Sequence, residues 1–358
     1  MKIIIAGAGS SGLILARELA KLGIGVHILE RKKKILPIYG SSGILSVKGL
    51  DSLKINYKDC VLNKLYGANI HFCKTSLHIH SKKPQAYVVD RTLLAEELYG
   101  EAVGNGANIE FAHALEKSEI SRLKGIVVGA EGVASQVARY YKFPPIRRYV
   151  LTFRAEYTAR EDMDNVEIFF DNSIMKGFFG WIAPHGDKVE VGAGIEERYG
   201  KGIEAYKNFL AKKEVKNFIK GKPLVEGGGI IPISLRKRFV YGDKKSLLVG
   251  DAAGQVKSST GGGIIFGGNA AIIASDAISK YLEYGSPLEN YEKQWRKKFG
   301  KDMKLHRIIH YLYSSPNDNI LDFLATATKT LGIENFLSKY GDMDSPSLII
   351  KRFFLRKN

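Results

Sequence analysis

Cysteine is almost missing from this sequence. The 358-residue chain has two cysteines, Cys60 and Cys73. Two thiols cannot supply a four-thiolate iron–sulfur cluster or a four-cysteine zinc site, and they form no disulfide framework. We therefore expect a protein of a reducing, cytoplasmic compartment.

Long apolar runs are missing as well. No run of about 18 apolar residues occurs, and the nearest, residues 261–277, is interrupted by Asn269 and Asp276. The sequence therefore predicts no transmembrane helix. Its apolar start is similar to a secretory signal, but glycines follow it and the next apolar stretch contains the charged pair Arg17-Glu18, which argues against one.

Acidic residues are outnumbered by basic ones. The chain has 37 Asp+Glu against 54 Lys+Arg, a net charge of +17, and its 45% hydrophobic residues are typical of a folded globular protein. The basic residues are spread along the chain without a nucleic-acid-binding motif, so we predict no nucleic acid partner. A basic surface favours anionic cofactors or anionic lipid headgroups. Glutamine occurs four times, which indicates a thermophilic source.

The N-terminal residues have the pattern of a dinucleotide-binding unit. Residues 2–6 predict a strand buried on both faces, and residues 13–22 predict a helix. Between them stands the hexad Gly7-Ala8-Gly9-Ser10-Ser11-Gly12. Gly7 permits a tight turn, Gly9 lets a pyrophosphate approach the backbone, and Gly12 lets the helix pack closely on the strand.

An acidic residue follows at the spacing that this unit requires. Residues 25–30 predict a second strand ending in Glu30, 18 residues beyond Gly12. A carboxylate at this place accepts hydrogen bonds from an adenosine ribose and disfavours a 2′-phosphate. His27, in mid-strand, is interpreted as a packing residue.

A distant segment favours FAD over NAD as the dinucleotide. Residues 246–254 predict a buried strand that runs into Asp251, whose carboxylate can bind the ribityl hydroxyls of a flavin. Residues 260–264 then precede a helix predicted over 267–281, so their backbone N–H groups could meet a pyrophosphate or an isoalloxazine ring.

This segment also carries a family resemblance. The run Gly250-Asp251-Ala252-Ala253-Gly254-Gln255-Val256-Lys257, followed by Thr260-Gly261-Gly262-Gly263-Ile264, is similar to the geranylgeranyl reductases, including the archaeal digeranylgeranylglycerophospholipid reductases. These belong to the flavoprotein superfamily of p-hydroxybenzoate hydroxylase-like enzymes. Aromatic hydroxylases of that superfamily usually have His where Gly254 stands.

The resemblance extends over about residues 1–285 and implies further site residues. Residues 88–94 match the family's strand and Asp-Arg pair, which implies Arg91 beside the flavin, and Leu115, in the next strand-like stretch, falls on the adenine side. Residues 125–139 match a Gly-Ala-Asp-Gly segment in which Glu131 replaces the usual Asp. The implied cofactor-binding set is Gly7, Gly9, Ser10, Ser11, Gly12, Glu30, Arg31, Ser41, Ser42, Arg91, Leu115, Asp251, Gly263 and Ile264.

The substrate half is implied by an aromatic segment. Residues 177–184 and 189–194 are similar to the family's Trp-containing strand, Pro turn and returning strand, and Ile231-Pro232 matches a turn near the flavin. The substrate-binding set implied is Phe178, Phe179, Trp181 and Pro184. These side chains either line an apolar pocket for an isoprenoid chain or form ordinary sheet core.

One segment departs from the family pattern. Many reductases carry a Cys-Gly pair after the second strand, where this chain has Tyr39-Gly40-Ser41-Ser42-Gly43. Ser41 and Ser42 can hydrogen-bond a flavin, but neither is an acidic thiol. The catalytic residues, including the proton donor, therefore stay unassigned.

The expected fold class is α/β: a Rossmann-type FAD-binding domain with an inserted antiparallel-sheet substrate domain and a helical C-terminal region. The predicted boundaries are 1–62, 88–147 and 240–285 for the FAD-binding domain, 63–87 and 148–239 for the substrate domain, and 286–358 for the helical region. His78 and His80 share a strand face but lack a third ligand, so no metal is predicted. Residues 347–358 mix bulky apolar residues with cations and either contact an anionic membrane or pack on the domain.

The resemblance implies an FAD-dependent reductase that saturates carbon–carbon double bonds of geranylgeranyl chains in membrane-lipid biosynthesis. Its electron donor is NAD(P)H or reduced ferredoxin, which would make a redox protein a further partner beside the isoprenoid lipid. Two alternatives stay open because a shared fold does not fix the chemistry. They are a flavin monooxygenase acting on an aromatic or hydrophobic substrate, and a flavin-binding protein without redox turnover.

Overall fold

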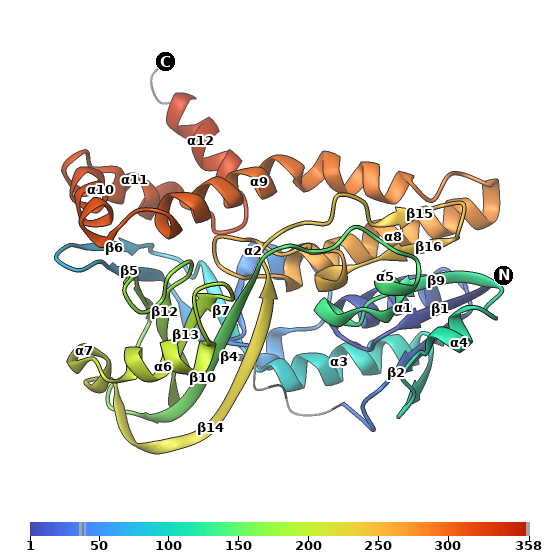
Figure 1. Ribbon diagram of the computed structural model, residues 1–358, viewed down its shortest axis with the longest axis horizontal. Coiled ribbons are helices and arrows are strands. Elements are labelled where there is room, and N and C mark those ends of the chain that lie inside the picture. Colours follow the sequence, from blue (N-terminus) through green and yellow to red (C-terminus); the bar gives the residue numbers. More distant parts are fainter. Residues whose placement is uncertain (36–37, 39–40, 356–358) are drawn as a thin grey trace.

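The computed structural model describes residues 1–35, 38 and 41–355. Two large sheets lie side by side, and long helices cover one side of the molecule (Figure 1). The predicted α/β class is confirmed. None of the helices in these described ranges is both long enough and apolar enough to cross a membrane.

The six-stranded sheet is the Rossmann-like core. Its neighbouring strands pair in parallel except at one edge, where the two last strands are antiparallel. Its order is β15 (Val240–Tyr241), β16 (Ser246–Leu248), β9 (Gly125–Gly129), β1 (Lys2–Ala6), β2 (Val26–Glu30) and β8 (Asn108–Phe111). The β-branched residues of β1 are fully buried, as expected for a strand covered on both faces.

Helices from distant parts of the chain pack around this sheet. α1 (Ser10–Lys21) contacts both α3 (Arg91–Gly104) and α8 (Ile264–Tyr284). Short helices complete this half: α2 (Val47–Leu53), η1 (Lys58–Cys60), α4 (Lys117–Ile120), η2 (Gly132–Ala134), α5 (Gln136–Tyr140) and η3 (Gly250–Ala252). The sheet and its helices share one apolar core, so residues near both ends of the sequence are needed to form it.

The seven-stranded sheet forms the other half. Its order is β14 (Ile219–Pro232), β10 (Tyr149–Ala159), β13 (Lys188–Glu196), β12 (Gly180–His185), β11 (Asn165–Phe169), β5 (Gly67–His71) and β6 (Ser76–His80). All pairs are antiparallel except β11 with β5, so the sheet that we expected to be antiparallel contains one parallel pair. α6 (Gly202–Leu210) packs on β10 and β13, and α7 (Lys213–Lys216) follows it.

A small third sheet divides the segment assigned to the substrate domain. β3 (Ile44–Ser46), β7 (Ala86–Val89) and β4 (Val61–Leu65) pair with one another, whereas β5 and β6 join the seven-stranded sheet. Residues 63–87 therefore do not lie in one sheet. The domain boundaries remain a prediction.

The last part of the chain is helical, as the sequence predicts. It comprises α9 (Asn290–Ser314), α10 (Asp318–Thr330), α11 (Ile333–Tyr340) and α12 (Pro346–Leu355). α9 runs along α8, and α12 projects from the body toward the C-terminus (Figure 1).

Three local expectations differ from the structure. Leu115 lies in a loop beyond the end of β8 rather than on a strand. Phe178 and Phe179 lie before β12 rather than in the Trp-containing strand, and Ile231-Pro232, expected as a turn, form the end of the long strand β14. Ile231 and Pro232 are extended because they pair with Val150 and Tyr149 of β10.

Candidate cofactor and substrate site

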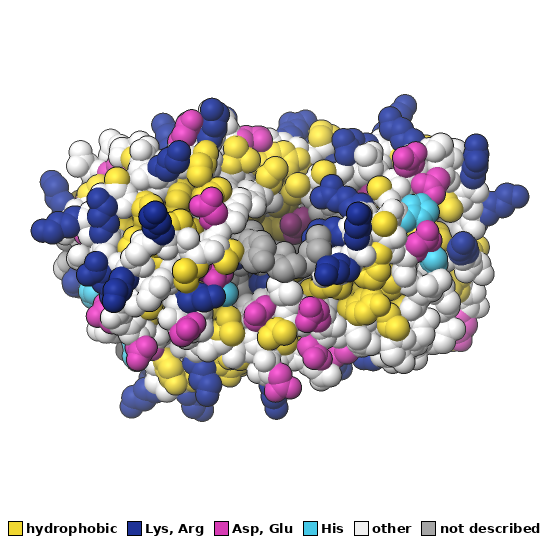
Figure 2. All heavy atoms as spheres, turned by 90° about the horizontal axis from the view of Figure 1, so that it is seen from below, with side chains coloured by type: hydrophobic (Ala, Val, Ile, Leu, Met, Phe, Trp, Pro, Cys, Tyr) yellow, Lys and Arg dark blue, Asp and Glu magenta, His cyan; other side chains and the backbone are white. Residues whose placement is uncertain are grey.

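A single cavity of about 720 Å³ runs between the two large sheets. Its lining begins at the turn between β1 and α1, passes Arg91 and Asp251, and ends at Phe178, Phe179 and Trp181. The face seen in Figure 2 is hollowed near its middle, between the two halves. The cavity thus joins the predicted cofactor residues to the predicted substrate residues.

The glycine turn leaves room where a ligand is expected. Gly7 has a φ of +98°, and a Cβ there would lie 2.7 Å from Ala130 O. A Cβ at Gly12 would lie 2.1 Å from Gly7 O, so Gly12 serves the close packing of α1 on β1. Beside Gly9, by contrast, the nearest atom to a Cβ would be 3.9 Å away, and Gly9 lines the cavity. This arrangement fits a phosphate group at the start of α1.

Glu30 is held at the end of β2 by the backbone of two turns. Its Oε2 accepts a hydrogen bond from Ala8 N–H at 2.7 Å, and its Oε1 accepts one from Lys32 N–H at 2.9 Å. The side chain is 9% exposed and lines the cavity, together with Arg31 and Leu115. The carboxylate is therefore fixed where it can accept hydrogen bonds from a ligand.

Arg91 and Asp251 form the polar middle of the cavity. Arg91 Nη1 donates to Ser41 Oγ at 3.1 Å and Nη2 donates to Ser10 Oγ at 3.3 Å. Its buried Nε has no hydrogen-bond partner within the described part of the chain. Burial lowers the pKa of Arg91 to about 10 and raises the pKa of Asp251 to about 6, while the attraction between the two opposes both shifts. Such incompletely satisfied groups fit a polar ligand.

The start of α8 forms the wall next to Asp251. Gly263 is the N-cap of this helix, and no side chain makes a capping hydrogen bond there. A Cβ at Gly263 would lie 2.8 Å from Asp251 Oδ1, and a Cβ at Gly261 would lie 2.8 Å from Ile231 Cδ1. Because these positions are glycines, no side chain covers the backbone at this wall of the cavity. Ile264, the next residue, also lines the cavity.

The far end of the cavity is apolar. Phe178 and Phe179 are stacked, with ring centroids 4.1 Å apart, and Ile168 and Ile231 also line this end. Trp181 Nε1 donates to Glu190 Oε1 at 2.6 Å, which fixes the indole ring. Gly192 makes room for that ring, since a Cβ there would lie 2.1 Å from it. This end can hold a hydrocarbon chain and exclude water.

A buried charge cluster lies behind Trp181. Glu190 Oε2 is 2.9 Å from Arg154 Nη1, which also contacts Glu156 Oε1 at 2.8 Å. Burial raises the pKa of Glu190, although the charge of Arg154 opposes the shift. The cluster supports the indole from outside the cavity.

The structure brings most of the predicted site residues together. The predicted residues that line the cavity are Gly7, Gly9, Ser10, Ser11, Glu30, Arg31, Ser41, Ser42, Arg91, Leu115, Asp251, Gly263, Ile264, Phe178, Phe179 and Trp181. Gly12 packs behind the turn, and Pro184 is buried in β12 opposite Val189, outside the lining. Tyr39 and Gly40 lie outside the described residues. The binding roles of all these residues remain predictions.

Sequence reasoning missed several lining residues. Lys257 stands inside the quoted motif but received no role, and Met343 comes from the C-terminal region, where no motif pointed to it. Glu131, singled out in the sequence as the replacement for the family's Asp, also lines the cavity, but its carboxylate accepts from Ser135 Oγ at 2.5 Å and from Gln136 N–H at 3.0 Å. Glu131 therefore caps the N-terminus of α5.

Among residues 1–35, 38 and 41–355, no cluster of three or more His, Cys, Asp or Glu side chains could hold a metal ion.

Comparison with known families agrees with this geometry. Residues 1–141 match the FAD binding domain family. The fold and the site thus define the class of FAD-binding flavoproteins. The chain belongs, within that class, to the geranylgeranyl reductase family of FAD-dependent oxidoreductases.

Individual relatives cover nearly the whole chain. An uncharacterized protein of Methanocaldococcus jannaschii is 30% identical, over 98% of this chain and 94% of that protein. A digeranylgeranylglycerophospholipid reductase of the same organism is 26% identical, over 91% and 90%. The crystal structure of a geranylgeranyl bacteriochlorophyll reductase-like protein from Thermoplasma acidophilum superposes with a TM-score of 0.82 at 20% identity, over 98% and 94% of the two chains. The flavin-dependent brominase Bmp2 reaches a TM-score of 0.69 at 15% identity over both full chains, which shows a shared fold.

Proposed function

We propose that this protein is an FAD-dependent reductase that saturates carbon–carbon double bonds of geranylgeranyl chains in membrane-lipid biosynthesis. The observation that carries the proposal is the single cavity, which connects a dinucleotide cradle to an apolar, aromatic end. The relatives named digeranylgeranylglycerophospholipid reductase support the substrate class.

The polar part of the cavity is proposed to hold FAD. Gly7, Gly9 and the start of α1 would bind the phosphates, and Glu30 would accept hydrogen bonds from the adenosine ribose. Asp251 and Arg91 would bind the polar groups between the phosphates and the ring. When bound, FAD supplies the hydride that a saturation reaction requires.

The apolar end is proposed to hold the isoprenoid chain. Phe178, Phe179 and Trp181 would contact the hydrocarbon and keep water away from the reacting carbons. The hydrogen bond between Trp181 and Glu190 fixes one wall, which would limit the orientations of the chain. The proton that completes saturation has no assigned donor in this chain.

The backbone conformation at Gly254 argues against the monooxygenase hypothesis. Gly254 has a φ of +75°, and a Cβ there would lie 2.3 Å from Ser234 O. The histidine that aromatic hydroxylases usually carry at this position does not fit this backbone. The redox-inactive alternative is tested by the turnover experiment below.

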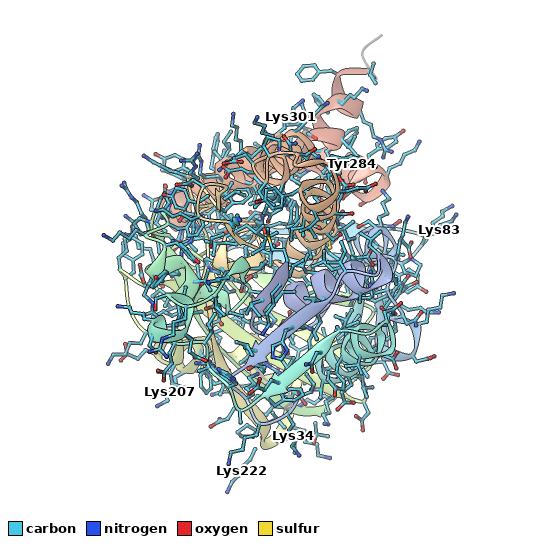
Figure 3. The ribbon with its side chains drawn as sticks, turned by 90° about the vertical axis from the view of Figure 1, so that its right-hand side faces the viewer. Lys34, Lys83, Lys207, Lys222, Tyr284 and Lys301 are labelled. Atoms are coloured by element: carbon cyan, nitrogen blue, oxygen red, sulfur yellow. The ribbon has the colours of Figure 1, made fainter. Side chains whose placement is uncertain are left out.

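Two partners are proposed beyond the lipid. The electron donor is NAD(P)H or reduced ferredoxin, and the net charge of +17 favours encounters with an anionic donor. Lysines such as Lys34, Lys207, Lys222 and Lys301 extend outward from different parts of the surface (Figure 3). Such a surface also favours peripheral contact with an anionic membrane, which would bring the protein to its lipid.

The membrane contact is assigned to the C-terminal apolar surface. This surface consists of the large apolar side chains that α9, α10 and α12 expose, and Lys351 and Arg352 lie among them on α12. Its members are Ile308, Ile309, Tyr311, Leu312, Ile320, Phe323, Leu324, Leu348, Ile350, Phe353, Phe354 and Leu355. Apolar side chains interspersed with cations match the boundary of an anionic bilayer.

Anaerobic turnover tests the proposed function. The purified protein is reduced with dithionite under anaerobic conditions and mixed with a geranylgeranyl lipid. We expect the flavin to be reoxidised while the lipid gains one H₂ for each double bond reduced, as measured by mass spectrometry. NADH, NADPH and reduced ferredoxin are then compared as donors.

Two variants of Trp181 sharpen this test. Trp181→Gln should lower the saturation rate at least about tenfold, since it places an amide at the apolar end, whereas Trp181→Phe should retain most of the rate. The flavin absorption spectrum should be unchanged in both. A flavin that stays reduced until oxygen enters, followed by insertion of an oxygen atom into an aromatic substrate, would replace this proposal with the monooxygenase.

A further inference from the structure

The turn before α8 carries a buried lysine at the junction of the two ends of the cavity. Lys257 is 3% exposed and lines the cavity. A Cβ at Gly262 would lie 2.7 Å from Lys257 Cε and 3.2 Å from its Nζ. The next glycine, Gly263, faces Asp251, while a Cβ at Gly261 would lie 3.4 Å from Phe178 Cζ. Lys257 therefore lies between the polar cofactor wall and the apolar end.

The C-terminal segment holds this lysine in place. Lys257 Nζ donates to Asp344 Oδ1 at 2.6 Å and to Met343 O at 3.1 Å. Ser46, the N-cap of α2, also donates to the Asp344 carboxylate. Burial raises the pKa of Asp344, but the charge of Lys257 and these hydrogen bonds outweigh it and hold that pKa below its usual range. The Asp344 carboxylate is thus ionised at neutral pH.

The ammonium group has one N–H left for a ligand. An ammonium has three N–H bonds, and the described residues supply two acceptors for them. Because Lys257 lines the cavity, the remaining bond can serve a molecule bound there.

A histidine of α9 also holds this turn in place. His306 of α9 bonds Ser259 Oγ through Nδ1 at 2.7 Å and Asp344 O through Nε2 at 3.2 Å. Burial, followed by the nearby charge of Lys257, lowers the pKa of His306 to about 4, so its ring is neutral at pH 7. The cation therefore cannot move away without breaking several buried contacts.

We propose that Lys257 binds the flavin ring and raises the reduction potential of FAD, and that Asp344 limits the size of this effect. A reactive ring must lie where cofactor and hydrocarbon meet, and Lys257 occupies that junction. Reduction adds negative charge to the ring, and a cation in a water-poor site stabilises the reduced form. The proposal rests on FAD binding and not on the identity of the lipid.

Redox titration against reference dyes, under anaerobic conditions at pH 7, tests the proposal. Lys257→Met removes the charge but keeps most of the side-chain volume, so the equilibrium constant for two-electron reduction should fall at least tenfold, which is about 30 mV. Lys257→Arg keeps the charge and should remain close to the wild-type value. Asp344→Asn removes the opposing charge and should shift the potential in the opposite direction.

A matched control is Lys48 of α2, which pairs with the same C-terminal segment. Lys48 Nζ is 3.1 Å from Asp342 Oδ2, and the Lys48 side chain is 70% exposed, outside the cavity. Lys48→Met should leave the potential unchanged. An unchanged potential in Lys257→Met, or shifts of the same sign in Lys257→Met and Asp344→Asn, would overturn the proposal and leave the pair a purely structural link.

Two features keep the outcome interpretable. If Lys257→Met does not fold, Lys257→Gln removes the same charge and should lower the equilibrium constant in the same direction, and an unchanged potential there would overturn the proposal. The titration contains no isoprenoid, so its result is independent of whether the proposed lipid substrate is correct.

Discussion

Asp251 combines an acidic side chain with a site that disfavours its charge. Burial raises its pKa from 3.8 to about 6, so the folded apoprotein binds a proton more tightly there than the unfolded chain does. The stability that this provides is present below pH 4 and is lost as pH rises toward 6. In the holoprotein, hydroxyl groups of the ligand would compensate the carboxylate.

Asp251→Asn should therefore stabilise the apoprotein and weaken FAD binding. The shift corresponds to at most about 3 kcal/mol, and since Asp251 is partly exposed to the cavity we expect about 2 kcal/mol at pH 8 and little at pH 4. Urea unfolding at both pH values measures the stability, and flavin fluorescence measures binding. Asp243→Asn, at an exposed turn position, is the control and should change neither. An equal gain at both pH values would contradict the assigned origin of the pKa shift.

Single residues were predictable where the backbone pattern itself requires them. Glu30 follows from its spacing to the glycine turn, and the structure places it against Ala8 N–H in that turn. The contact between Lys257 and Asp344 spans 87 positions of sequence and follows no local pattern. It exists because the segment after α11 returns to the cavity, where Met343 lines the wall.

At the scale of elements, the exposed apolar end of α12 leads to a prediction about membrane binding. Phe354 and Leu355 are 65% and 61% exposed at its end. The double variant Phe354→Asp and Leu355→Asp should reduce binding to anionic vesicles at least about tenfold, since each side chain buried in a bilayer contributes about 1.5 kcal/mol or more. Co-sedimentation with anionic and with zwitterionic vesicles measures the effect.

The control for α12 is an exposed aromatic on another helix. Tyr284, the last residue of α8, is 70% exposed, and α8 runs to the side of the molecule away from α12 (Figure 1), so Tyr284→Asp should leave vesicle binding unchanged. If the α12 variant instead changes the oligomeric state in the absence of lipid, the C-terminal apolar surface is an interface between copies of this chain.

Elements with a clear period were predicted well. The helix expected over 267–281 is α8, which begins at Ile264, and the strand expected over 2–6 is β1. Phe178 and Phe179 were expected within a strand, but they lie in the turn before β12, where their rings stack and Phe179 contacts Tyr313 of α9. That packing partner lies more than a hundred residues away.

At the scale of the whole molecule, the extent of the cavity predicts which ligand stabilises the protein most. Because one cavity extends from Glu30 to Trp181, FAD should raise the melting temperature of the apoprotein more than FMN or ADP does at the same concentration. A ligand at 100 times its Kd adds about 2.7 kcal/mol of stability. Thermal unfolding monitored by circular dichroism measures the three increments.

Glu30→Gln distinguishes ligand binding at the adenosine end of the cavity from binding at the other end. It should lower the stabilisation by FAD and by ADP, which carry the adenosine, and leave that by FMN unchanged. Equal stabilisation by FMN and FAD in the wild-type protein would show that the Glu30 end does not take part in binding.

The sequence by itself determined the class of this protein, because the glycine turn, the acid that follows it and the second motif near Asp251 act through backbone geometry that local residues specify. It also determined the helical character of the C-terminal region. Only the tertiary structure decided that these motifs and the aromatic segment line one cavity, that β5 joins β11 in parallel, and that Asp344 holds Lys257. The physical reason is that these are long-range contacts, which form when two sheets and the final helices pack together, and no local spacing encodes which distant side chains then meet.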